Sequence, residues 1–183
     1  PSGYAGWLCE YDKMGNVTRQ SYLDAQMLPT QDENGICSFT MERDLRGNVT
    51  KYLFYNEKGE PTLSREGIAG MEFSYNDGGN EIERRFFNIK GEPTKGYLGY
   101  AKRTHTYDEM GHELSNRYLG LDGNLTLVDG IAGTNYKVDN HGNIIEDMPI
   151  GLNQKLASGR LLARYKYDNK DNIIEKYSHI ISP

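Results

Sequence analysis

The side chains best suited to chemistry in this 183-residue chain are cationic and aromatic residues gathered between positions 84 and 105. Cations beside aromatic rings can bind an anionic glycan, a peptide or an acidic protein partner. Alternatively, the charges lie on a solvated outer face while the rings pack inside, and the residue pattern favours this second interpretation. The candidate binding patch comprises Arg84, Arg85, Lys95, Tyr97, Tyr100, Lys102, Arg103 and His105.

The arrangement of nucleophiles, histidines and carboxylates does not predict an enzyme. The sequence has no Ser/His/Asp order, no Gly-x-Ser-x-Gly motif, no Walker loop and no HExxH motif. Its carboxylates form no repeated close pair of the kind that a glycosidase needs. The four histidines, His105, His112, His141 and His179, are better explained as turn and strand residues than as metal ligands. We therefore expect no catalytic residue, no metal and no cofactor.

Charge and hydropathy narrow the class of partner. The formal net charge is -5, and nucleic acids reward basic surfaces, so nucleic acid is not an expected partner. The mean hydropathy is -0.74, and no apolar run reaches the roughly 18 residues of a membrane span. Direct membrane insertion is therefore not expected, whereas a protein or a glycan partner stays open.

A short motif recurs along the whole chain. In its fullest form it reads Tyr-Asp-x-x-Gly-Asn, beginning at Tyr11, and a period in this range is typical of stacked supersecondary units. Its turn residue, spaced by 32, 32, 32, 31 and 29 positions, is Gly15, Gly47, Gly79, Gly111, Gly142 and Asp171. The sequence predicts one array over residues 1–183, with about six units at 3–34, 35–66, 67–98, 99–129, 130–158 and 159–183.

Each unit is expected to hold two strands joined by a hairpin turn. Apolar residues alternate with polar ones before the turn, as at Ala69, Met71, Phe73 and Tyr75, which indicates a half-buried strand. Asp or Asn then opens the turn, and Gly at the fourth position supplies the positive φ of a type I turn with a bulge. Second strands are expected at 17–23, 49–55, 81–87 and 113–119. The predicted fold class is all-β, an elongated hairpin array that forms either a twisted antiparallel sheet or a β-solenoid.

The rest of each unit is a second turn followed by a short connector. Residues 56–62 and 88–94 are near copies, and Pro61 and Pro93 within them favour an edge or a loop, because proline removes a ladder donor. Unit five lacks this turn signature. Its residues 150–158 are expected to form a longer loop or one short helical turn.

The first residues enter the repeat in mid-unit. Gly3-Tyr4-Ala5 occupies the position that Gly35-Ile36-Cys37 and the later copies hold, so we expect the chain to be a fragment of a longer protein. Cys9 and Cys37 both occupy core-face positions of the repeat. Two cysteines are too few for a disulfide framework, and whether they pair stays open.

The motif carries two family resemblances. Tyr11-Asp-Lys-Met-Gly-Asn-Val and Tyr107-Asp-Glu-Met-Gly resemble the YD repeats of RHS-type bacterial surface and toxin proteins, although the period here is longer than usual. Phe54-Tyr-Asn-Glu-Lys-Gly-Glu-Pro is similar to the aromatic hairpins of cell-wall-binding and glucan-binding repeats. Both resemblances imply an extracellular or cell-surface location and repeats without enzymatic activity.

Two functions follow as hypotheses. The first is a non-catalytic β-repeat segment of a larger bacterial surface or secreted protein, acting as a scaffold or a protein-interaction surface. The alternative is a carbohydrate or cell-wall binding module that uses aromatic rings exposed between hairpins. They differ in whether the rings near the strand ends are buried or open, namely those of Tyr22, Tyr55, Phe87, Tyr100 and Tyr118.

Overall fold

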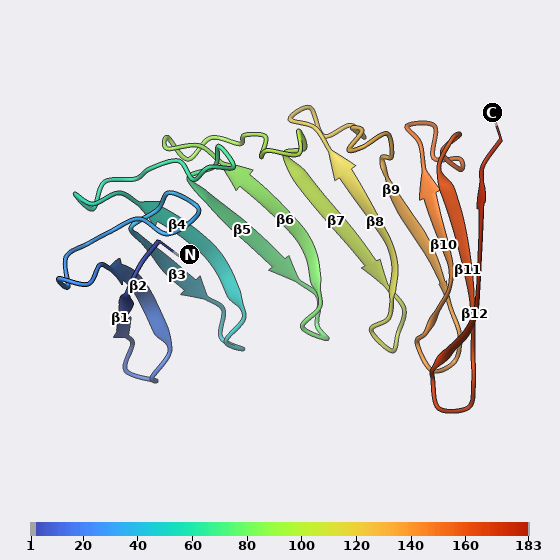
Figure 1. Cartoon of the computed structure of the whole chain (residues 1–183), viewed down its shortest axis with the longest axis horizontal. Coiled ribbons are helices and arrows are strands. Elements are labelled where there is room, and N and C mark those ends of the chain that lie inside the picture. The colour runs from blue at the N-terminus through green and yellow to red at the C-terminus, as the bar shows by residue number, and fades with distance from the viewer. Residues whose placement is uncertain (1–2, 183) are drawn as a thin grey trace.

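The computed structural model describes residues 3–182 as one antiparallel sheet of twelve strands. The strands lie side by side in chain order, with β1 and β12 at opposite ends of a curved row (Figure 1). They are β1 Gly6–Tyr11, β2 Val17–Leu23, β3 Ser38–Arg43, β4 Val49–Tyr55, β5 Gly70–Tyr75, β6 Glu81–Phe87, β7 Lys102–Tyr107, β8 Glu113–Leu119, β9 Gly133–Val138, β10 Ile144–Ile150, β11 Leu161–Tyr167 and β12 Ile173–Ile180.

The predicted all-β hairpin array is confirmed, and the array forms an open sheet rather than a solenoid. The four second strands occupy the residues predicted for them, as β2, β4, β6 and β8. Their starts follow from local chemistry, because each begins directly after a turn that contains Gly, and each ends in a pair of apolar or aromatic residues. No helix able to span a membrane occurs among residues 3–182.

The recurring turn is held by its aspartate. Asp12 Oδ1 accepts hydrogen bonds from the backbone N–H groups of Met14 and Asn16, at 2.8 and 2.9 Å. The Gly15 N–H donates to the Asp12 carbonyl at 3.1 Å, and Gly15 has a φ of 85°. The strand register shifts between Glu10 and Tyr11, which is the bulge expected beside such a turn. The turn chemistry predicted from the motif is therefore present.

The tyrosine of the motif joins one hairpin to the one before it. The Tyr75 hydroxyl donates to the Val49 carbonyl at 2.7 Å, and the Tyr107 hydroxyl donates to the Glu81 carbonyl at 2.7 Å. Tyr167 makes the same kind of contact in the last hairpin. Both halves of the Tyr-Asp pair thus have structural roles, the aspartate within a hairpin and the tyrosine between hairpins.

The hydrophobic core lies on one face of the sheet, beside the longer connectors that run along the upper edge in Figure 1. Rings near the strand ends alternate there with apolar residues of the connectors. Burying one such side chain stabilises a fold by about 1.5–3 kcal/mol, so this ridge holds the connectors onto a sheet of a single layer. Its buried members are Tyr22, Ile36, Phe54, Ile68, Phe86, Tyr100 and Val128.

The expectation of a longer loop or helical turn at residues 150–158 is wrong. The Gly151 N–H donates to the Lys155 carbonyl at 2.9 Å, and the Gln154 N–H donates to the Gly151 carbonyl at 3.0 Å. Unit two makes the same backbone turn with Gly59, whereas here Gln154 adopts a φ of 59°. A single residue in the left-handed region costs only about 1–2 kcal/mol, so the repeat keeps its turn without the glycine.

Each connector touches the sheet briefly and then continues as a loop. Pro61 forms an isolated bridge with Tyr55, and the Thr62 N–H donates to the Phe54 carbonyl at 3.0 Å. The sequence left a choice between an edge and a loop for this proline segment, and the structure combines one bridge with a loop.

The two cysteines are both free thiols. Cys37 is buried, and desolvation, as the largest cause, raises the pKa of its thiol. Cys9 is half-buried on β1. The question that the sequence left open is therefore answered in favour of unpaired cysteines.

The two faces of the sheet differ in chemistry. On the face that we call the aromatic face, successive strands carry rings and a methionine in register, such as Phe39 opposite Phe54 and Tyr52 opposite Met71. The ring centroids of Phe39 and Tyr52 lie 5.7 Å apart in an edge-on arrangement, which favours aromatic pairs.

On the opposite face, which we call the charged face, ion pairs run across the strands. Lys51 Nζ lies 3.2 Å from Glu72, and Glu72 also pairs with Arg85. Lys102 Nζ lies 3.2 Å from Glu83 on the next strand pair. The alternation of charge across strands satisfies these side chains locally, as cross-strand pairs of opposite charge do.

Candidate functional site

The aromatic face changes character between β6 and β9, where two arginines occupy positions that hold other residue types in the preceding repeat. Arg84 of β6 lies directly opposite Arg103 of β7. The corresponding pair 32 residues earlier is Tyr52 of β4 opposite Met71 of β5. Like charges directly opposite each other in a sheet are destabilising, so this pair is the first feature of the face that packing alone does not explain.

The two arginines have unequal surroundings. Arg84 lies 5.1 Å from the centre of the Phe73 ring and donates Nε and Nη2 to the two carboxylate oxygens of Glu81, each at 3.0 Å. Arg103 lies 5.5 Å from the centre of the Tyr118 ring. Its Nε is buried without a partner, and no hydrogen bond or ion pair to Arg103 is present among residues 3–182. Arg103 is therefore a half-buried cation with unused donors.

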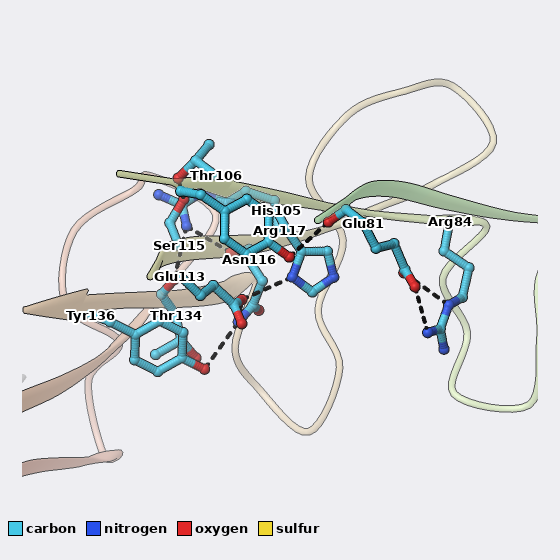
Figure 2. Close-up of polar contacts among 11 residues, drawn as sticks. Glu81, Arg84, His105, Thr106, Glu113, Ser115, Asn116, Arg117, Thr134 and Tyr136 are labelled. Carbon is cyan, nitrogen blue, oxygen red and sulfur yellow. Dashed lines mark hydrogen bonds and ion pairs between the residues drawn. The ribbon is translucent and has the colours of Figure 1, made fainter. Parts of the chain in front are cut away.

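A polar network lies on the same face across β7, β8 and β9 (Figure 2). His105 Nδ1 lies 2.8 Å from Glu113 Oε1. Asn116 Nδ2 donates to Glu113 Oε1 at 3.3 Å and to the Tyr136 hydroxyl at 3.1 Å. Burial, as the largest cause, raises the pKa of Tyr136. Hydrogen-bonded polar side chains thus take up part of a face that is apolar elsewhere. The repeat sets the place of each of them along its strand.

The network is polar but has no nucleophile in contact with its histidine. Asn116 is 1% exposed, and its Oδ1 is buried without a hydrogen-bond partner. The Thr106 and Ser115 hydroxyls lie 2.7 Å from each other, and no hydrogen bond joins either of them to His105 among residues 3–182. The arrangement can hold a proton between His105 and Glu113, and it can offer arginine donors to an anion.

The structure divides the eight residues of the predicted patch into three groups. Four of them gather on the aromatic face, where Tyr100 packs against Phe86 and Tyr118. Two lie on the charged face, and two lie in the connector before β7, where Tyr97 is exposed. The groups are Arg84, Tyr100, Arg103 and His105; Arg85 and Lys102; and Lys95 and Tyr97.

Sequence reasoning missed the partners of these residues. Glu81, Glu113, Asn116 and Tyr136 complete the network but belong to no recognised motif. Asp147 extends the polar surface onto β10, opposite Tyr136, and burial, as the largest cause, raises its pKa. The repeat itself was the signal that could have pointed to this region. A position-by-position comparison at a spacing of 32 aligns Arg84 with Tyr52 and so shows where the residue type changes.

The aromatic face also has a hollow of about 250 Å³ between β2 and β5. The rings of Tyr22, Phe39 and Tyr52 line it together with the polar side chains of Asp32 and Ser64. Burial, followed by the charge of Asp32, raises the pKa of Tyr22 to about 12. Aromatic and polar side chains therefore share this hollow.

Among the rings named by the carbohydrate-binding hypothesis, Tyr22 lines this hollow and Tyr55 and Phe87 line a second one, but none of the five is exposed. Tyr22, Phe87 and Tyr100 are buried, and Tyr55 and Tyr118 are half-buried. Among residues 3–182 no group of three His, Cys, Asp or Glu side chains is placed to hold a metal ion.

Comparison with known proteins shows the fold. A scan against protein-family models found no match, and a search of curated proteins found none either. This chain is similar to the crystal structure of TcdB2-TccC3-TEV, with a TM-score of 0.59 and 16% identity, over 93% of this chain and 7% of that chain. It also matches the Photorhabdus luminescens Tc holotoxin pore, with a TM-score of 0.45 and 14% identity, over 95% of this chain and 9% of that chain. The first match shows a shared open β-repeat fold within a far longer chain.

Proposed function

We propose that this chain is a non-catalytic scaffold segment of a larger secreted or cell-surface protein of the RHS type, in which it forms part of a continuous β-sheet wall. The observation that carries the proposal is the apolar character of both open edges of the sheet. Trp7 and Leu8 on β1 and Ile174 and Ile180 on β12 are each more than half exposed.

Open edges of this kind are normally protected. Natural sheets place charges, proline, bulges or a covering segment on an edge strand, and repeat arrays end in units with a polar outer face. β1 carries a single charged residue, Glu10, and β12 has large aliphatic side chains at both of its ends, with the charged residues Glu175 and Lys176 between them. Such strands are suited to receive a further strand, so a sheet that continues beyond both edges accounts for their composition.

The similarity in fold supports the same proposal. The TcdB2-TccC3-TEV chain matches nearly the whole of this sequence with 7% of its own length, as expected if a short array is one part of a large sheet. The Tyr-Asp turns and the tyrosine contacts between hairpins are compatible with an RHS-type repeat. On the same grounds we propose that the protein lies outside the cell.

The test is the state of association of the 183-residue chain in solution. Unprotected edges pair with one another, so light scattering should show association that increases with protein concentration. A double variant, Leu8→Lys with Ile174→Lys, should stay monomeric. The control Leu45→Lys changes an equally apolar but fully exposed turn residue away from both edges, and should associate like the wild type.

Two results would contradict the proposal. One is a wild-type chain that stays monomeric at every concentration. The other is that Leu45→Lys disperses the oligomers as completely as the edge variant does. That result would mean that an added charge anywhere on the surface disperses the oligomers, whether or not it lies at an edge.

A glycan-binding role is the second candidate. The hollow lined by Tyr22, Phe39 and Tyr52 is a better place for a glycan than the rings near the strand ends as a group. Aromatic rings next to polar side chains are the usual lining of small-molecule sites. On a glycan array, Tyr52→Ala should abolish binding, whereas Tyr97→Ala, an exposed connector ring outside the hollow, should not. Absence of binding by the wild-type chain would remove this candidate.

A further inference from the structure

Arg84 and Arg103 face each other on adjacent strands, at positions where the preceding repeat has Tyr52 and Met71. Directly opposed residues in an antiparallel pair have Cβ atoms about 4.5–5.5 Å apart. The two side chains therefore start from neighbouring points of a half-buried surface, and each guanidinium lies over the ring of its other neighbouring strand, Phe73 on β5 or Tyr118 on β8. Packing alone does not account for two cations at these positions, because like charges directly opposite each other in a sheet are destabilising.

The nearby carboxylates do not neutralise Arg103. Glu81 accepts two hydrogen bonds from Arg84, and Glu113 accepts from His105 and Asn116. Glu72 and Glu83 lie on the charged face and pair with Lys51, Arg85 and Lys102 there. Among residues 3–182 no carboxylate therefore pairs with Arg103, and its Nε is hidden from bulk water without a hydrogen bond.

A buried donor without a partner is costly, since it has lost its hydrogen bonds to water and gained none. The Tyr118 ring fixes the guanidinium plane of Arg103 from one side, and the Phe73 ring does the same for Arg84. Arg84 already donates Nε and Nη2 to Glu81, so it is the planar guanidinium of Arg103 that can meet two oxygen atoms of one group, which is the geometry that arginine uses for carboxylates and phosphates.

We propose that Arg103, together with Arg84, forms a binding site for an oxyanion, a carboxylate or a phosphate group that lies on the aromatic face. The bound anion accepts hydrogen bonds from Arg103 and reduces the repulsion between the two guanidinium groups. The rings of Phe73 and Tyr118 flank the group that carries the anion. This site depends on its own residues and not on the scaffold proposal.

The experiment titrates the folded chain with inorganic phosphate, with sodium chloride at matched ionic strength as the reference. The readouts are the NMR signals of the arginine Nε–H groups and the midpoint of thermal unfolding. Phosphate should shift the Arg103 signal in a saturable way and raise the midpoint above the chloride reference. Arg103→Gln should weaken the apparent affinity about tenfold or more, as expected for loss of a charge-assisted hydrogen bond.

Two further variants make the result specific. Arg85→Gln removes a neighbouring cation on the charged face, and should leave phosphate binding unchanged. Arg103→Lys keeps the charge but loses the planar fork, and should bind with an affinity between those of Arg103→Gln and the wild type. In the absence of phosphate, Arg103→Gln should remain folded, because it removes a repulsive contact and an unpaired donor; its unfolding midpoint checks this.

A short glutamate-rich peptide provides the second arm of the experiment. Competition between the peptide and phosphate would show that the site accepts either source of an oxyanion, and binding of one alone would identify the source. The proposal is overturned if neither probe binds, if chloride reproduces the effect of phosphate, or if Arg103→Gln binds phosphate as tightly as the wild type.

Discussion

The aromatic face between β2 and β5 and the same face between β6 and β9 have one backbone geometry and two chemistries. In the first region Tyr52 meets Met71, and in the second Arg84 meets Arg103, at the same register 32 residues later. The turns and the tyrosine contacts between hairpins recur in both regions. The repeat thus fixes the position of each side chain, and its type is free to vary because the turns, not the face, maintain the hairpins.

The core ridge continues through both regions, with Phe86, Tyr100 and Val128 in the second, but the second region adds buried polar groups. The first relies on burial of rings and of Ile68, which is 1% exposed. The second contains Asn116, which is also 1% exposed. Asn116 Oδ1 and Arg103 Nε are both buried there without a hydrogen-bond partner. Each buried polar group without a partner costs about 1–3 kcal/mol. The polar region therefore gives up stability, which is consistent with a site adapted to a ligand.

The largest expected effect comes from shortening one apolar side chain in each region and comparing the losses of stability. Ile68→Ala should lower the free energy of unfolding by about 2–5 kcal/mol, because it leaves a cavity in the core ridge. Ile131, in the connector that precedes β9 of the polar region, is only half-buried, so Ile131→Ala should cost clearly less. Chemical denaturation of both variants measures this, and equal losses would contradict the contrast between the regions.

A second pair of changes tests whether the turns are independent of either face. Gly79 has a φ of 82°, and open space surrounds the point where a Cβ atom would lie, so Gly79→Val should lower the free energy of unfolding by about 1 kcal/mol or more through backbone strain alone. Met27 occupies a comparable turn position with a φ of 63°. Met27→Gly should therefore raise the free energy of unfolding by roughly 1 kcal/mol. Unchanged stability in both would refute the turn assignment.

Alkaline pH should weaken the aromatic region through Tyr22. Burial, together with the charge of Asp32, raises its pKa to about 12 from 10.0. The folded state therefore holds the proton more tightly than the unfolded state, so this contribution to stability is complete below pH 10 and is lost as the pH rises toward 12. Tyr22→Phe should flatten the fall of stability across that range, whereas Tyr97→Phe, on an exposed ring, should leave it unchanged.

In the polar region Asp147 gives the corresponding effect at acid pH. Burial raises its pKa above 3.8, so the folded state favours the protonated acid, and stability falls as the pH rises through this value. Asp147→Asn should therefore be more stable than the wild type at about pH 7, and the difference should shrink at about pH 3. Unfolding in denaturant at the two pH values checks the sign, and a less stable variant at neutral pH would contradict it.

The smallest effect is expected on the charged face. Arg85 pairs with Glu72, and its side chain is largely exposed, so Arg85→Gln should change the free energy of unfolding by less than about 1 kcal/mol. The same substitution leaves the aromatic face untouched. A loss as large as that of Ile68→Ala would mean that the charged face, not the core ridge, holds the sheet together.

The sequence alone determined most of the local structure. The second strands at 17–23, 49–55, 81–87 and 113–119 and the aspartate-glycine turns agree with the structure, because turn chemistry and side-chain alternation act over a few residues. Unit five was the exception, since Gln154 adopts a conformation that its residue type does not announce.

Only the tertiary structure decided the rest. The choice between an open sheet and a solenoid depends on which strands pair, and no local pattern contains that information. The same holds for the predicted patch, where Arg84 and Arg85 are adjacent in sequence but lie on opposite faces, and Arg84 meets Arg103 across the strands. Local interactions set the period of this protein, whereas strand register, which joins residues far apart in sequence, decided which charges share a surface.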